Sequence, residues 1–244
     1  MSVSVSSSRL VGRRVLVTGG ASGIGREIAV LCVAEGAQVV VLDRDEPAVP
    51  CDGVAAVRAD VCRESEVCAA VEQAAQIMGG LDAVVNAAGV SSNWKLADLT
   101  LAEWERVMAI NMTGTFLVCR AALPYLRQAS SASIVNIASA AALRPAGPGH
   151  VAYAASKGAV LAFTKAIAHE LAPGVRANVV CPGMTETPMT AQAIRSRPEI
   201  VASQLLGRVA QPQDIARTVI FLLSDESSFT TGATFAVDGG RTMY

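Results

Sequence analysis

The amino-acid sequence predicts an α/β protein with a Rossmann-type, doubly wound, mostly parallel sheet of seven strands and helices on both faces. Three observations support this fold class. Short apolar runs alternate with longer segments of helical composition, which is the order of strand–crossover–strand units. A glycine-rich turn joins the first apolar run to the first helical segment. The 244 residues contain no linker or internal repeat, so residues 1–244 are expected to form a single domain.

Seven apolar runs are predicted to be the strands, at residues 13–18, 38–43, 54–59, 81–87, 133–138, 175–181 and 234–237. The second run is unbroken, as expected for a strand that is buried on both faces. Composition and spacing predict helices at residues 26–35, 63–78, 101–126, 149–171 and 213–223. Pro124 is expected to kink or break the helix in which it lies. Residues 184–208 have no strong pattern and are expected to form a lid over a substrate.

Composition argues against several classes of function. The formal net charge is −1, so nothing favours nucleic acid or an anionic membrane surface as a partner. No uninterrupted apolar run reaches the roughly 18 residues of a membrane span. Residues 1–9 have neither the basic start nor the apolar centre of a signal peptide, so we expect a disordered lead-in and a cytoplasmic protein.

The cysteines and histidines do not predict a metal site. None of the six cysteines forms a Cys-x-x-Cys pair, and neither histidine stands at metal-ligand spacing from a cysteine. Free thiols in a reducing compartment are therefore expected.

The turn from Thr18 to Gly25 reads Thr-Gly-Gly-Ala-Ser-Gly-Ile-Gly and lies between a strand and a helix. Its glycines allow backbone N–H groups to approach a pyrophosphate, and the helix dipole favours the negative charge. Asp43 ends the second strand, 18 residues beyond Gly25, where a carboxylate can accept hydrogen bonds from an adenosine ribose. The sequence therefore predicts a dinucleotide site.

Polar and turn-forming residues gather at the predicted carboxyl ends of the strands. Sheets of this kind bind ligands beyond those ends. The residues concerned are Gly19, Asp43, Asp60, Asn86, Ser139 and Pro182.

Tyr153 and Lys157 stand four residues apart in an alanine-rich segment without proline or glycine between them. This spacing places both on one face of a helix, and a nearby ammonium lowers the pKa of a phenol from about 10 toward the range of a general acid or base. The pair alone is a weak signal, because many helices carry a packed tyrosine beside a solvated lysine. The order of the motifs that precede it strengthens the catalytic interpretation.

In combination the motifs resemble those of the short-chain dehydrogenases/reductases, and the resemblance extends from residue 13 to residue 240. It is carried by Thr-Gly-x-x-x-Gly-x-Gly at 18–25, Asp60-Val61, Asn-Ala-Ala-Gly at 86–89, Asn111, Ser139, Tyr-x-x-x-Lys at 153–157, Pro-Gly at 182–183 and Asp-Gly-Gly at 238–240.

The resemblance implies a role for each matching residue. Tyr153 would be the general acid in carbonyl reduction and the base in alcohol oxidation, while Lys157 would lower its pKa and bind the nicotinamide ribose. Ser139 would hydrogen-bond the substrate oxygen, and Asn111 would support a water-mediated proton relay behind Lys157. The implied cofactor contacts are Gly19, Ser22, Gly23, Ile24 and Gly25 at the phosphates, Asp60 and Val61 at the adenine, Asn86 and Gly89 at the middle, and Tyr153, Lys157, Pro182, Gly183, Thr185 and Thr187 at the nicotinamide end.

Two positions depart from the family pattern. Ala87 stands where a second asparagine is commoner, and Thr185 replaces the usual valine or isoleucine. Both contacts are expected to be made largely by the backbone, so neither change endangers catalysis. His150 could face the substrate but fits a polar residue at a helix start better, and Trp94 could equally wall the pocket or serve packing.

These residues predict an NAD(H)-dependent oxidoreductase that interconverts a secondary alcohol and a ketone. Asp43 would repel the extra phosphate of NADP, and Ser22 stands where NADP-using members often have arginine or lysine; Arg44 is the one nearby counter-charge. A 3-oxoacyl-[acyl-carrier-protein] reductase is the alternative, since Gly207-Arg208 and residues 224–228 resemble that branch. A non-catalytic dinucleotide-binding protein is a further alternative. The resemblance implies a dimer or a tetramer. The helices that begin near Leu101 and Gly149 are apolar well beyond one face, so we expect them to pack against partners in a homotetramer.

Overall fold

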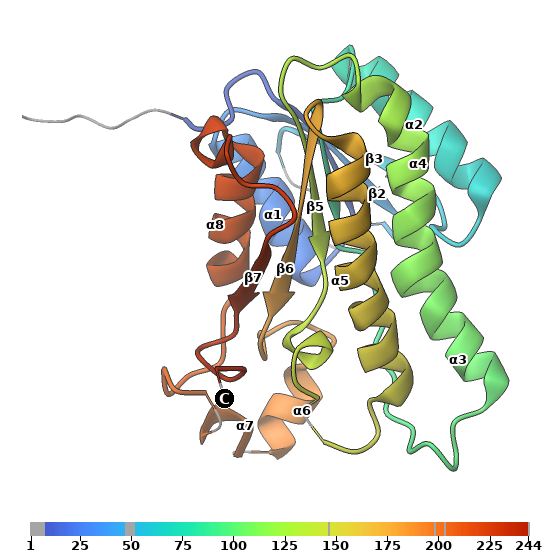
Figure 1. Ribbon diagram of the computed structural model, residues 1–244, viewed down its shortest axis with the longest axis vertical. Coiled ribbons are helices and arrows are strands. Elements are labelled where there is room, and N and C mark those ends of the chain that lie inside the picture. Colours follow the sequence, from blue (N-terminus) through green and yellow to red (C-terminus); the bar gives the residue numbers. More distant parts are fainter. Residues whose placement is uncertain (1–7, 47–51, 146, 198, 203, 244) are drawn as a thin grey trace, which may run out of the picture.

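The computed structural model describes residues 8–46, 52–145, 147–197, 199–202 and 204–243. They form one seven-stranded sheet in which every strand pairing is parallel, in the order β3-β2-β1-β4-β5-β6-β7 (Figure 1). The predicted fold class is therefore confirmed. The strands are β1 Arg14–Thr18, β2 Gln38–Asp43, β3 Val54–Arg58, β4 Ala83–Asn86, β5 Ala132–Ile137, β6 Val175–Pro182 and β7 Thr234–Val237.

Helices cover both faces of the sheet. They are α1 Gly23–Ala34, α2 Glu64–Met78, α3 Leu101–Met108, α4 Gly114–Leu126, α5 Val151–Leu171, α6 Ala191–Ser196, α7 Glu199–Ala202 and α8 Pro212–Leu223. Helices α1 and α8 lie on one face, and α2, α4 and α5 lie on the other (Figure 1). Side chains alternate along β1 and so contribute to the core on each face. Val15 and Val17 pack on the face covered by α1 and α8, and Leu16 packs on the face covered by α2, α4 and α5.

The helix predicted at residues 101–126 is divided by a π-helical turn at Ala109–Thr113. Pro124 does not break it, because α4 continues to Leu126, beyond the proline. The division instead falls around Asn111, and π-helical turns are common at functional sites. The spacing of apolar residues could not locate this turn. A π-helical turn adds one residue to the helix, and the apolar pattern of residues 101–126 is too broad to show that addition.

The combined helix Leu101–Leu126 is also long and apolar enough to cross a membrane by length and composition, with a mean hydropathy of 1.3. Its apolar character has a source within the domain. Val107, Val118 and Ala122 are wholly buried, and α4 packs on α2 and the sheet.

Arg9, which was expected to belong to a disordered lead-in, is in fact held by Glu35 at the end of α1. Its guanidinium and its backbone N–H both donate to that carboxylate, at 2.6 and 2.9 Å. The predicted disorder is wrong for Arg9, while residues 1–7 lie outside the described residues. The predicted lid likewise contains two short helices, α6 and α7, which a weak apolar pattern did not predict.

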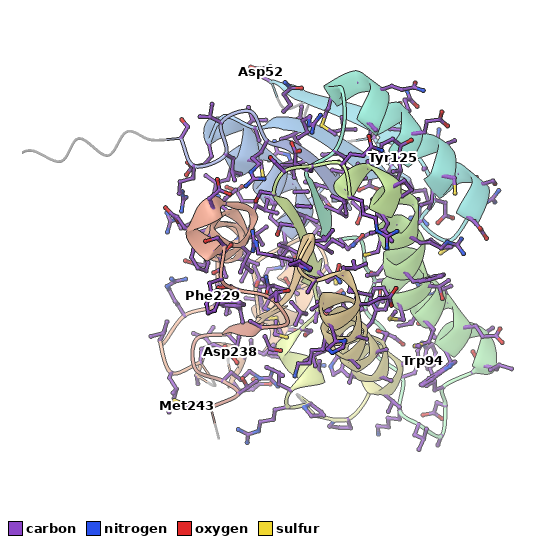
Figure 2. All side chains as sticks on the ribbon, turned by 45° about the horizontal axis from the view of Figure 1, so that its top comes forward. Asp52, Trp94, Tyr125, Phe229, Asp238 and Met243 are labelled. Carbon is purple, nitrogen blue, oxygen red and sulfur yellow. The ribbon has the colours of Figure 1, made fainter. Side chains whose placement is uncertain are left out.

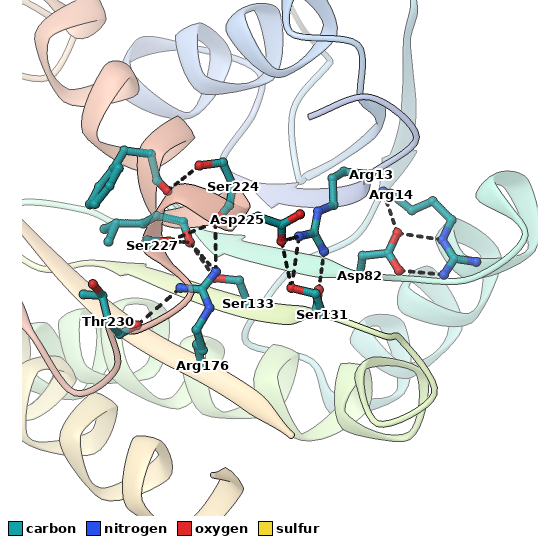
Figure 3. A network of polar contacts seen from close by, with 12 residues as sticks. Arg13, Arg14, Asp82, Ser131, Ser133, Arg176, Ser224, Asp225, Ser227 and Thr230 are labelled. Carbon is teal, nitrogen blue, oxygen red and sulfur yellow. Dashed lines mark hydrogen bonds and ion pairs between the residues drawn. The ribbon is translucent and has the colours of Figure 1, made fainter. Parts of the chain in front are cut away.

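Arginines join separate elements at the amino-terminal end of the sheet (Figure 3). Arg13 donates to the backbone carbonyl of Ser131 and pairs with Asp225 at 2.5 Å. Arg14 forms a two-pronged pair with Asp82 at 2.8 and 2.6 Å. These contacts tie the start of β1 to the starts of β4 and β5.

Arg176, near the start of β6, caps the end of α8 (Figure 3). Its guanidinium donates to the carbonyls of Leu222 at 3.0 Å and Ser224 at 3.3 Å. Ser133 on β5 donates to the same Leu222 carbonyl at 2.9 Å. The last carbonyls of a helix have no intrahelical donor, so these side chains satisfy them and fix α8 against the sheet.

Candidate active site

A cavity of about 310 Å³ opens at the carboxyl ends of the strands. It brings together most of the predicted site residues from across the chain. The predicted residues in its lining are Gly19, Ser22, Gly23, Ile24, Gly25, Asp43, Asp60, Val61, Gly89, Ser139, Tyr153, Lys157, Pro182, Gly183, Thr185 and Thr187. Asn86 and Asn111 are not among the lining residues.

The glycine-rich turn has no room for side chains. A Cβ on Gly19 would lie 2.7 Å from the backbone of Ala88, and the φ of Gly19 is +71°. A Cβ on Gly25 would lie 2.2 Å from the carbonyl oxygen of Gly19. Close backbone approach therefore requires glycine here, as expected for a turn that presents its N–H groups to a ligand.

The N-terminus of α1 is suited to an anion. Ser22 occupies the N-cap without a side-chain capping bond, and the first turn has no acidic residue. The first hydrogen bond of the helix runs from Arg26 N–H to the Ser22 carbonyl, at 3.2 Å. The N–H groups of residues 23–25 therefore have no intrahelical acceptor. These residues line the cavity, so their N–H groups can bind the pyrophosphate of a dinucleotide.

Asp43, the last residue of β2, lies beside the glycine-rich turn. Its carboxylate accepts hydrogen bonds from the backbone N–H groups of Ala21 at 2.9 Å and Asp45 at 3.1 Å. Each oxygen keeps a lone pair for a further donor, such as a ribose hydroxyl. Asp60 is held similarly, by the backbone N–H of Cys62 at 2.9 Å, and Val61 beside it is buried.

Ser139 and Tyr153 meet in the cavity wall from β5 and α5. Ser139 Oγ accepts the backbone N–H of Ala141 at 3.1 Å, which leaves the hydroxyl proton for a substrate oxygen. Burial raises the pKa of Tyr153, and the Ser139 hydroxyl opposes the rise. The predicted lowering of the Tyr153 pKa by Lys157 is therefore wrong for the chain alone, because desolvation outweighs the other influences on the phenol.

Lys157 is buried one turn further along α5, with 5% of its surface exposed. Its ammonium donates to the backbone carbonyl of Ile137, at the end of β5, over 2.8 Å. Burial lowers the pKa of this lysine from 10.5 to about 8. The side chain is thus fixed by one backbone contact and titrates close to neutral pH.

Asn111 lies behind Lys157 rather than in the cavity wall. Its side-chain oxygen accepts the N–H of Val90 at 2.8 Å, and its side-chain nitrogen donates to Ser156 Oγ at 2.9 Å. A Cβ on Gly89 would lie 3.3 Å from both Asn111 Oδ1 and Lys157 Nζ. Asn111, Lys157 and Gly89 therefore form one compact unit next to the tyrosine.

Asn86 was expected to contact the middle of a cofactor, but its side chain points into the domain. It donates to Asn136 Oδ1 at 2.8 Å and to Cys119 Sγ at 3.2 Å, and it is 3% exposed. Side chains alternate along β4, and Asn86 shares the inward direction of Val84. The cavity is lined instead by the residues that follow it, Ala87 to Val90.

The segment after β6 completes the cavity. A Cβ on Gly183 would lie 2.6 Å from the Cα of Asp238, so this glycine permits the close approach of β6 and the end of β7. Thr190, which sequence reasoning missed, donates to the carbonyl of Thr185 at 2.5 Å and lies 3.0 Å from Thr187 Oγ1. The sequence feature that could have indicated Thr190 is the cluster of threonines at 185, 187 and 190, because threonine hydroxyls often bond to nearby backbone groups.

His150 and Trp94 form an isolated β-bridge with each other and are not among the residues that line the cavity. His150 is the N-cap of α5, and its Nδ1 stands 3.2 Å from the carbonyl of Ser92. The interpretation as a polar residue at a helix start is therefore confirmed for His150. Trp94 is 52% exposed, so it is not a core residue.

The described cysteines are all free, as predicted, and Cys51 lies outside the described residues. Burial raises the pKa of Cys119 to about 12 and that of Cys181 to about 11, so both remain protonated thiols. Within the described ranges, no group of three or more histidine, cysteine or acidic side chains could hold a metal ion.

A glycine-rich turn, a serine–tyrosine–lysine group in the same cavity and a doubly wound sheet are together the features of an oxidoreductase that uses a dinucleotide. Comparison with known proteins agrees. A family model described as enoyl-(acyl carrier protein) reductase matches residues 19–242. The chain is 41% identical to 2-(S)-hydroxypropyl-CoM dehydrogenase 3 of Xanthobacter autotrophicus, over 97% of this chain and 99% of that protein.

Two further relatives extend the comparison. A 3-alpha-(or 20-beta)-hydroxysteroid dehydrogenase of Mycobacterium bovis is 41% identical, over 96% of this chain and 91% of that protein. The solved structure of an aldohexose dehydrogenase of Thermoplasma acidophilum is 33% identical, with a TM-score of 0.91 over 97% of this chain and 96% of that one. The chain belongs to the short-chain dehydrogenase/reductase family, whose dehydrogenases act on alcohols and ketones with a nicotinamide dinucleotide.

Proposed function

We propose that this enzyme interconverts a secondary alcohol and a ketone with NAD(H), using Tyr153 as the general acid and base. The observation that carries the proposal is the shared cavity. Ser139, Tyr153 and Lys157 line the same cavity as the glycine-rich turn, so a dinucleotide bound at the turn and a substrate at the tyrosine would be neighbours.

Each residue has a defined part in the chemistry. When bound, the nicotinamide supplies or accepts the hydride. In reduction, Ser139 donates a hydrogen bond to the substrate oxygen and Tyr153 gives that oxygen its proton; in oxidation, Tyr153 takes the proton back. Desolvation raises the pKa of Tyr153, and the Ser139 hydroxyl opposes that rise, so the same serine that binds the substrate oxygen also favours the phenolate.

Preference for NAD over NADP rests on Asp43. Its carboxylate lines the cavity at the end of β2, at the position expected for the adenosine ribose. A ribose phosphate there would meet a like charge, while Arg44 is 67% exposed on its side chain and already pairs with Asp45 at 3.3 Å. Ser22 offers no counter-charge. We therefore infer NAD as the cofactor.

The relatives support an alcohol or ketone as the substrate, since they include dehydrogenases of a hydroxysteroid and of a hydroxypropyl compound. The stretches that resemble a carrier-protein reductase hold the two ends of α8 in this chain. Arg208 pairs with Asp214 in the first turn of α8 at 2.6 Å, and Ser224 and Ser227 bond around the end of that helix. These residues serve the fold, so they give little support to a carrier-protein substrate.

The proposal is tested by turnover of a panel of secondary alcohols and ketones with NAD(H) and NADP(H), for the natural chain and for Tyr153→Phe. We expect turnover with NAD(H), and a loss of about 10²–10⁴ in the variant with cofactor affinity retained. A variant with near-natural turnover would remove Tyr153 from the mechanism. Binding of NADH without turnover of any substrate would favour the non-catalytic alternative.

We further propose a cytoplasmic homotetramer, with α4 and α5 as one contact surface. Val107, Val118 and Val160 are buried within the subunit and leave nothing for a partner. Phe116 is 37% exposed and stands edge-on to Phe163 with ring centroids 6.4 Å apart. Light scattering at micromolar concentration tests the assembly: a mass of four chains is expected, and a monomer would contradict it.

A further inference from the structure

Four segments follow strands at the end of the sheet where the catalytic cavity opens, and together we name them the mouth; residues of the first three line the cavity. The four segments are residues 90–96 after β4, residues 139–150 after β5, residues 183–210 after β6 and residues 238–243 after β7, each taken as far as the structure describes it. Figure 1 shows all four at the end of the sheet to which the strand arrows point, together with α6, α7 and the C-terminus.

Contacts between the segments join all four of them in one connected series. Trp94 forms a parallel β-bridge with His150, which joins the first segment to the second. Arg241 donates to the backbone carbonyl of Arg144 at 3.2 Å, which joins the fourth to the second. Leu206 N–H donates to the carbonyl of Gly239 at 3.3 Å, which joins the third to the fourth.

Every segment of the mouth exposes a large apolar side chain. The least exposed of them, Leu143, is 41% accessible, and the most exposed, Leu96, is 74% accessible. The seven are Trp94, Leu96, Leu143, Met189, Leu205, Leu206 and Met243. Figure 2 shows Trp94 and Met243 on opposite sides of this end of the molecule.

Single exposed apolar residues are common on protein surfaces, but apolar residues gathered around an opening mark a binding site. The location decides what binds. One member of the group, Met189, lines the same cavity as Ser139 and Tyr153, so the apolar group reaches the proposed site of the reaction. A second protein chain covering all four segments would close the entrance to that cavity, whereas a substrate would use it.

We propose, on the basis of the function proposed above, that the natural substrate is a bulky, largely apolar ketone or secondary alcohol with a fused-ring or similarly broad hydrocarbon body. The oxygen reaches Ser139 and Tyr153 while the body lies against the mouth. The rival class is an anionic substrate, because Arg144 and Arg241 also lie in the mouth and form no ion pair among the described residues.

The test compares kcat/KM with NADH for 2-butanone, cyclohexanone, 2-decalone and a four-carbon keto acid. We expect kcat/KM to rise at least about 100-fold from butanone to decalone, because each buried methylene adds binding in the transition state. Equal values along the neutral series, or a keto acid that exceeds decalone, would overturn the proposal.

Variants locate the effect. Trp94→Ala and Leu206→Ala are expected to lower the decalone-to-butanone ratio of kcat/KM about tenfold each. The matched control is Phe229→Ala, which removes a fully exposed aromatic ring outside the mouth (Figure 2) and should leave the ratio within about twofold. An unchanged ratio in both mouth variants would contradict the proposal.

The proposed function can fail separately from the apolar substrate class. If no ketone is turned over, the oxidoreductase assignment is at fault, and calorimetric titration of decalone and butanone in the presence of NADH still tests the mouth. Decalone binding at least about tenfold tighter, and weakened by Trp94→Ala, supports an apolar site. Equal or undetectable binding of both ketones counts against it.

Discussion

The side-chain nitrogen of Asn111 donates a hydrogen bond to Ser156 Oγ over 2.9 Å, and Ser156 in turn donates to the backbone carbonyl of Tyr153 over 2.8 Å. Ser156 is wholly buried. The π-helical turn that holds Asn111 is thereby joined to the turn of α5 that carries Tyr153, the proposed general acid and base. Ser156 touches neither the cavity nor a reacting atom, so we interpret it as a positioning residue.

Ser156→Ala should lower kcat about tenfold, because one hydroxyl fixes both the asparagine and the tyrosine turn. The dissociation constant for NADH should change by less than about threefold. Stability should fall by about 1–3 kcal/mol, the cost of leaving a buried donor unpaired. The measurements are steady-state kinetics across pH, NADH titration and thermal unfolding. A variant that loses stability but keeps both kcat and its pH profile would reduce Ser156 to a structural role; partial rescue by Ser156→Cys would support positioning.

Cofactor affinity should depend on the protonation of Lys157. Its pKa is lowered to about 8 by burial, so the ammonium is present below that pH and is lost above it. Bound cofactor hydroxyls favour the charged form, so the dissociation constant for NADH should be flat below pH 7 and rise about tenfold by pH 9.5. Fluorescence titration measures it. Lys157→Met should bind more weakly with a flat profile, and an equally steep rise in that variant would assign the titration to another group.

Substitutions of Asp43 should separate charge from hydrogen bonding. The natural chain should have at least tenfold higher kcat/KM with NAD(H) than with NADP(H), since a repulsion of about 2–4 kcal/mol is expected at the ribose phosphate. Asp43→Asn should narrow this gap while keeping an acceptor for Ala21 N–H. Asp43→Ala also removes that acceptor, so it should weaken NAD binding further. Equal use of both cofactors by the natural chain would refute the assignment.

Gly89 and Gly158 offer a matched pair of glycine-to-alanine changes. A Cβ on Gly89 would lie 3.3 Å from both Lys157 Nζ and Asn111 Oδ1, so Gly89→Ala should displace these groups and lower kcat about tenfold. A Cβ on Gly158 meets nothing within 4 Å, and Gly158 lies inside α5. Gly158→Ala should keep full activity and stabilise the protein by about 0.5–1 kcal/mol. Kinetics and thermal unfolding of both variants provide the comparison; an active Gly89→Ala variant would show that this packing is dispensable.

Local patterns predicted most of the fold and much of the site. The spacing of Tyr153 and Lys157, and the strand before the glycine-rich turn, are properties of short stretches, so the sequence could place them. The inward direction of the Asn86 side chain could not be predicted, because it depends on which face of the sheet its helices cover. Ser156 was missed because its partner is 45 positions away. The π-helical turn around Asn111 was missed because an added residue leaves the apolar composition unchanged.

Arg13 and Arg176 fix the ends of β1, β5 and β6 that lie opposite the candidate active-site cavity. Strand register is therefore set at a distance from the mouth, so the contacts that hold these strands and the residues proposed for the chemistry lie at opposite ends of the sheet. An engineer can exploit this separation. Exchanging residues 90–96 or 204–210 for the matching loops of a relative should change the range of substrates while the melting temperature stays nearly constant. Because the two ends of the sheet are separate in this way, new substrate specificities can arise in the loops without any change to the sheet.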